Sequence, residues 1–123
     1  MRKLSVLLMV VFLAACVLQC GICEAKATKD QMINKAEEAL RAGGVDLVGV
    51  NVIYDDGNTF WEERLAYIET DTSQNHGILP HGVLRNKEYQ VVFFDFVASS
   101  PTEDVWVFLD PDTGDVISIY EEK

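Results

Sequence analysis

The stretch that decides the fold is residues 105–120, VWVFLDPDTGDVISIY. Two apolar runs, 105–109 and 116–120, flank a short segment that is rich in Asp and contains one Pro and one Gly. Such runs are typical of β-strands, and a segment of this kind between them is typical of a tight turn. The sequence therefore predicts a β-hairpin in which Gly114 takes a positive φ.

Working outward from the hairpin, two more strands are predicted. Residues 89–97 form an apolar run whose only charge is Asp95, and Ser99 to Thr102 turn the chain before the hairpin begins. Residues 47–54 alternate between apolar and polar side chains, which indicates a strand with one buried face. Consecutive strands joined by short turns favour an antiparallel meander.

A helix is predicted for residues 28–42, ahead of the first strand. Thr28 suits the N-cap, Gln31 is placed to complete a capping box, and Gly43-Gly44 supplies the stop. An apolar stripe at helical spacing runs along it, made of Met32, Ile33, Ala36, Ala39 and Leu40. The fold class predicted is α+β in two layers: this helix packed on an antiparallel meander of about four strands, with a second helix and a long loop inserted after the first strand.

The inserted segment covers residues 58–87. Trp61, Leu65 and Ile68 recur at helical spacing, and Thr59 with Glu62 fits a capping box, so a second helix is predicted over 59–69; a returning hairpin strand is the alternative. Residues 70–87 are expected to form an irregular connection. The segment either covers the second face of the sheet or forms a partner-binding surface.

Residues 1–25 read as a targeting segment. A cationic start is followed by the apolar run Leu4 to Leu18, which is shorter than the roughly 20 residues of a membrane-spanning helix. Because the apolar run continues past Cys16, ordinary signal-peptide cleavage near Ala25 is favoured. The alternative is a lipobox at residues 13–16, with a lipid on Cys16. Either route predicts an extracytoplasmic domain of residues 26–123, secreted, periplasmic or lipid-anchored, without membrane insertion after processing.

The predicted domain contains no cysteine and is strongly acidic. All three cysteines lie within residues 1–25, so the fold must hold without disulfides. Without Arg2, Lys3 and Glu24, the 10 basic and 20 acidic residues of the chain become 8 and 19, a formal charge of −11. This charge repels nucleic acid and suits a soluble protein or a basic partner.

No pattern in the sequence predicts catalysis, a cofactor or a metal. His76 and His81 lack further ligands at a fixed spacing, and the loop from Asp110 to Asp115 is too short for an EF-hand, so a turn is expected there. No nucleophile or facing acid–base pair is evident. The protein is predicted to be a non-enzyme that binds a protein partner, and the candidate partner-binding residues are Phe60, Trp61 and Trp106.

Residues 89–94 and 105–117 resemble the end of a PepSY-like domain, which closes with an apolar strand, an Asp, a Thr-Gly turn and a Val-rich strand. The matching residues here are Val107, Asp110, Thr113, Gly114 and Val116. The opening helix and first strand resemble the start of that domain. The resemblance implies a cystatin-like α+β module that works by binding, for example by restraining a peptidase. It also implies that the module has no catalytic residues. The ending also resembles that of NTF2-like immunity proteins, which implies the alternative of neutralising a basic toxin.

The leader generates the first testable prediction. Mass spectrometry of the protein isolated from its native source should find an N-terminus near Lys26 or, if the lipobox is used, a lipidated Cys16. Recovery of the mature protein with an intact Met1 would contradict both routes.

Overall fold

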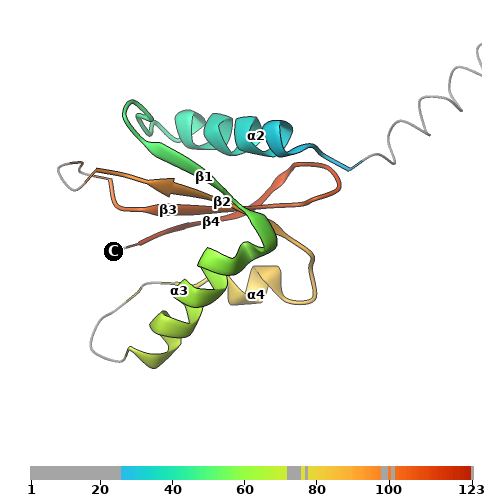
Figure 1. The fold of residues 1–123 in the computed structure, drawn as a ribbon, viewed down its shortest axis with the longest axis vertical. Coiled ribbons are helices and arrows are strands. Elements are labelled where there is room, and N and C mark those ends of the chain that lie inside the picture. Colours follow the sequence, from blue (N-terminus) through green and yellow to red (C-terminus); the bar gives the residue numbers. More distant parts are fainter. Residues whose placement is uncertain (1–25, 72–75, 77, 98–99, 101, 123) are drawn as a thin grey trace, which may run out of the picture.

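The computed structural model describes residues 26–71, 76, 78–97, 100 and 102–122, and Figure 1 shows their arrangement. The leader predicted for residues 1–25, including Cys16, lies outside the described residues. The elements in chain order are α2 (Lys29–Ala42), β1 (Asn51–Asp55), the 3-10 turn η1 (Asp56–Asn58), α3 (Thr59–Thr70), α4 (His81–Leu84), β2 (Gln90–Asp95), β3 (Val105–Leu109) and β4 (Val116–Glu121). Among these helices, none has the length and apolar character needed to cross a lipid bilayer.

The four strands form one antiparallel sheet in the order β1-β2-β3-β4. The strands β1 and β2 are neighbours although α3 and α4 lie between them in the chain. The predicted α+β layout, with an opening helix, a four-stranded meander and an inserted second helix, is therefore confirmed.

Helix α2 covers one face of the sheet. Its capping box is formed as predicted: the N–H of Gln31 donates to Oγ1 of Thr28 at 3.2 Å, and the N–H of Thr28 donates to Oε1 of Gln31 at 2.9 Å. The stripe on α2 then packs against alternate residues of the central strands. This first core contains Met32, Ala36, Leu40, Val92, Phe94, Phe96, Val105, Val107 and Leu109.

The opposite face of the sheet is partly covered by α3 and α4, as Figure 1 shows. Trp61 is 1% exposed, and its ring lies 4.8 Å from that of Phe108 and 5.3 Å from that of Trp106. This second core contains Trp61, Ile68, Leu84, Val91, Trp106, Phe108 and Tyr120. The prediction of a second helix is confirmed, and the stripe begun by Trp61 faces inward.

Two predictions about the limits of regular structure are wrong. The first strand begins at Asn51 rather than Leu47, because Gly49 takes a φ of 75° and the N–H of Val50 donates to the carbonyl of Leu47 in a turn. The connection predicted over 70–87 contains the short helix α4, whose Leu84 is buried against the second face.

Helix α3 begins differently from the capping box predicted for Thr59 and Glu62. Thr59 is already the first helical residue, and Asn58 before it has a φ of 58°. The cap comes instead from Asp55, whose two carboxylate oxygens accept the N–H groups of Phe60 at 3.1 Å and Trp61 at 2.9 Å. Asp55 is fully buried, and its carboxylate lies at the N-terminal end of α3, where unpaired N–H groups favour an anion.

Asn58 cannot cap α3 with its side chain because that side chain is bonded to the sheet. Its Nδ2 donates to the carbonyl of Tyr89 at 2.8 Å, and its Oδ1 accepts the N–H of Val91 at 2.9 Å. Nε2 of Gln90 donates to the carbonyl of Asp55 at 2.7 Å. The junction between β1 and α3 is thus fixed to the start of β2.

The hairpin between β3 and β4 has the predicted turn. The carboxylate of Asp110 accepts the N–H of Asp112 at 2.8 Å, and Gly114 has a φ of 77° while its N–H donates to the carbonyl of Asp110. A Cβ at Gly114 would lie 3.4 Å from Cβ of Ala27, so the loop also leaves room for the segment that enters α2.

The cap on α3 generates a prediction. Replacing Asp55 with Ala should lower the free energy of unfolding by roughly 2 kcal/mol, because two N–H groups at a buried helix start lose their acceptors. Chemical denaturation measures this change. Asp56→Ala is the matched control, since the neighbouring residue is exposed, and it should change stability by less than about 0.5 kcal/mol. Equal effects of the two substitutions would contradict the assigned cap.

Candidate functional site

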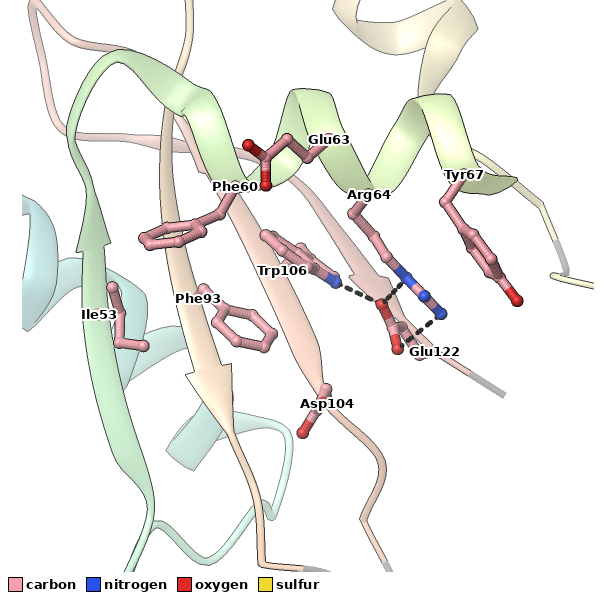
Figure 2. A pocket seen from close by; sticks show the side chains of 9 residues that line it. All are labelled: Ile53, Phe60, Glu63, Arg64, Tyr67, Phe93, Asp104, Trp106 and Glu122. Atoms are coloured by element: carbon pink, nitrogen blue, oxygen red, sulfur yellow. Dashed lines mark hydrogen bonds and ion pairs between the residues drawn. The ribbon is translucent and has the colours of Figure 1, made fainter. Parts of the chain in front are cut away.

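A groove lies between α3 and the second face of the sheet, shown in Figure 2. It has a volume of about 420 Å³, within the range of roughly 300–1,000 Å³ that is usual for ligand pockets. It lies where α3 leaves the sheet uncovered. The lining residues are Ile53, Phe60, Glu63, Arg64, Tyr67, Phe93, Asp104, Trp106 and Glu122.

The floor of the groove comes from three adjacent strands. Ile53 of β1 pairs with Phe93 of β2, which pairs with Trp106 of β3, so the three side chains form a row across one face. The rings of Phe93 and Trp106 are stacked, with centroids 4.1 Å apart and planes inclined by 26°. The result is a continuous apolar surface.

The rim of the groove comes from α3. Phe60 and Tyr67 are seven residues apart, which places them on the same side of the helix, and they are 53% and 52% exposed. Figure 2 shows both side chains reaching from the helix, one near each end of the groove. The guanidinium of Arg64 lies 5.0 Å from the centre of the Tyr67 ring. Two large aromatic side chains thus remain half open to solvent.

One end of the groove is fixed by a three-residue network, drawn with dashed lines in Figure 2. Nε of Arg64 donates to Oε1 of Glu122 at 2.7 Å, and Nη2 donates to Oε2 at 3.2 Å. The indole N–H of Trp106 donates to the same Oε1 at 2.9 Å. This paired geometry holds the Arg64 side chain and orients the Trp106 ring.

Asp104 borders the same end of the groove, just before β3. Its Oδ1 accepts the N–H of Phe96 at 3.0 Å, and its own carbonyl accepts the N–H of Glu122. Burial raises the pKa of its carboxyl above the ordinary value of 3.8, and the hydrogen bond from Phe96 opposes this rise. The nearby carboxylates of Asp95, Glu122 and Glu103 raise the same pKa further.

The three candidate partner-binding residues have different positions. Phe60 lies at the rim and Trp106 forms part of the floor, although Trp106 is only 4% exposed. Trp61 lies in the second core, which removes it from the surface that a partner could reach. No local pattern in the sequence predicts that Arg64, Asp104 and Glu122 lie together, because their grouping depends on contacts between distant parts of the chain.

The two histidines lie apart, each beside an acidic residue. Nε2 of His76 is 3.3 Å from a carboxylate oxygen of Asp71, and Nε2 of His81 is 3.3 Å from one of Glu69. No group of three or more His, Cys, Asp or Glu side chains placed to hold a metal occurs among the described residues. The lining of the groove itself offers two kinds of contact: apolar contact with its floor and charge pairing with its carboxylates.

The fold and the groove define a small α+β domain whose second sheet face is partly open. Searches against protein-family models, curated proteins and solved structures found no match to this chain.

The raised pKa of Asp104 generates a prediction. Ionised Asp104 is less favourable in the folded protein than in the unfolded chain, so Asp104→Asn should raise the melting temperature at pH 7. The gain should be absent below the unfolded pKa of about 3.8 and should grow as the pH rises through the folded pKa. Melting curves at pH 3 and pH 7 measure it, with Asp112→Asn in the exposed hairpin loop as control. A gain that is the same at both pH values would contradict this assignment.

Proposed function

We propose that this protein is an extracytoplasmic, non-enzymatic module of PepSY-like type that binds another protein, such as a peptidase that it restrains. The observation that carries the proposal is the open apolar groove flanked by the half-exposed Phe60 and Tyr67. Aromatic side chains beside a concave apolar surface are the usual anchors of protein interfaces. A partner side chain placed in the groove would contact the Phe93–Trp106 stack and both rims together.

The lining of the groove supports binding rather than catalysis. None of its nine residues, all in the described part of the chain, is a Ser, Thr, Cys, His or Lys that could act as a nucleophile or a neutral base. Glu122 is engaged by Arg64 and by Trp106, so its carboxylate has a positioning role.

A second candidate is an immunity-type protein of NTF2-like kind that neutralises a basic toxin. Three of the four charged residues lining the groove are acidic, and residues 26–123 carry a formal charge of −11. Such a surface attracts a basic protein at long range and raises its association rate. The two candidates share the groove and differ in the partner.

The test is capture of the partner from the native envelope fraction. The double substitution Phe60→Ala with Tyr67→Ala should reduce the free energy of binding to the captured partner by at least about 2 kcal/mol. The melting temperature should stay close to that of the unmodified protein, because both side chains are half exposed. Val48→Ala is the control, since Val48 is 88% exposed and does not line the groove. It should leave capture unchanged.

Two results would contradict the proposal. Capture that is equal with the double variant and the unmodified protein would remove the groove from the interface. Turnover of a peptide, ester or glycoside that disappears with Asp104→Asn or Glu122→Gln would show an enzyme.

A further inference from the structure

We infer that the groove takes a segment of a protein partner in which a Lys or Arg side chain is adjacent to an apolar side chain. This inference rests on the proposed function and specifies the chemistry of the partner. It follows from three features of the groove: its apolar floor, the excess of acidic over basic residues in its lining, and the hydrogen bonds that each carboxylate already accepts.

The charge around the groove favours a cation. Arg64 is the single basic residue of the lining, against the acidic Glu63, Asp104 and Glu122. Asp95 and Glu103 add to the negative charge near Asp104. An anionic lipid, a nucleic acid or an acidic peptide would be repelled at this position. A cationic side chain would instead reduce the repulsion that the carboxylates exert on one another.

The hydrogen bonds identify the carboxylates that remain open to a ligand. Glu122 has its two oxygens occupied by the fork of Arg64, with the indole of Trp106 as a further donor. Asp104 uses Oδ1 for Phe96, and within the described residues its Oδ2 has no hydrogen-bond donor. Glu63 likewise has no ion-pair partner in the described part of the chain, and Figure 2 shows it beside Phe60. A cation entering the groove would therefore be held by Asp104 or Glu63.

The aromatic surface suits the remainder of such a segment. Long basic side chains lay their methylene stems on apolar surfaces while the charged head reaches a carboxylate, and Arg also stacks on aromatic rings. The Phe93–Trp106 stack supplies that surface, and the apolar neighbour in the segment would contact Phe60 and Ile53.

A second copy of this chain is a poorer occupant than a basic partner. Residues 26–123 contain 19 acidic and 8 basic residues, so two copies repel each other, and a carboxylate-bordered groove meets a surface of the same sign. The occupant that matches this groove is a segment of opposite charge from a different protein.

The test uses the purified protein and short peptides with blocked termini. The probe is a hexapeptide of Gly and Ser that contains one adjacent Leu-Arg pair, and the comparison peptides replace Arg with Gln or Leu with Ala. Binding is followed by the NMR signals of the tryptophan indole N–H groups, because that of Trp106 is bonded to Glu122 inside the groove. The Leu-Arg peptide should bind about tenfold more tightly than either comparison peptide, shift the Trp106 signal and weaken with added salt.

Charge variants locate the binding. The double substitution Glu63→Gln with Asp104→Asn should abolish the preference for Arg over Gln, and it keeps an oxygen at residue 104 to accept the N–H of Phe96. The matched control is Glu38→Gln with Asp112→Asn, which removes the same charge from exposed positions on α2 and on the hairpin loop. The control should keep the full preference.

The inference is overturned if the Gln peptide binds as tightly as the Arg peptide, if the groove variant keeps the preference, or if the Trp106 signal does not move. Self-association that Phe60→Ala abolishes, seen by sedimentation, would show that a second copy occupies the groove and would also overturn it. Capture of a partner that depends on Phe60 and Tyr67, without any preference for Arg, would leave the proposed function standing and remove this inference. A Leu-Arg preference at the groove without any captured partner would support the chemistry inferred for the groove and contradict the proposed function.

Discussion

The buried carboxylate of Asp55 is the constraint on which the rest of the structure depends. It ends β1 and, through its bonds to the N–H groups of Phe60 and Trp61, also begins α3. Asn58 joins the same junction to the start of β2. The direction of α3 across the sheet is therefore set at one point. The helix places its own Trp61 against Phe108 on the second face, and it leaves Ile53 and Phe93 open.

The groove combines two requirements that usually conflict. Its apolar floor is stabilised by exclusion of water, whereas its carboxylates favour solvent. The conflict is reduced for Glu122 by its pairing with Arg64 and Trp106, and it persists at Asp104, whose pKa is raised by burial and by neighbouring acids. Apolar surface and the negative charge of Asp104 thus lie together at one end of the groove.

Much of the fold could be predicted from the sequence because its signals are local. The capping box of Thr28, the hairpin turn around Gly114 and the stripe begun by Trp61 each depend on residues within a few positions of one another. The start of α3 differs from the prediction because its cap comes from the end of the preceding strand rather than from Thr59. The groove could not be predicted from local signals: Arg64 and Glu122 are 58 residues apart in sequence, and they meet only because α3 packs on the sheet beside the end of β4. Phe60 could be predicted as a candidate because it is an aromatic residue in the inserted segment 58–87, and aromatic residues are frequent anchors of interfaces.

The floor of the groove has a consequence for the energetics of the whole domain. Ile53, Phe93 and Trp106 come from three different strands, of which β1 is distant in the chain from the other two, and their side chains are adjacent only after the sheet has formed. No fragment of the chain carries this surface by itself. A molecule that occupies the groove therefore binds the native state and not the unfolded chain, and by mass action it stabilises the native state by RT ln(1 + [L]/Kd), where [L] is its free concentration. Binding and global stability are thermodynamically linked at this site, so the unfolding midpoint of the domain rises with the concentration of any molecule that binds there.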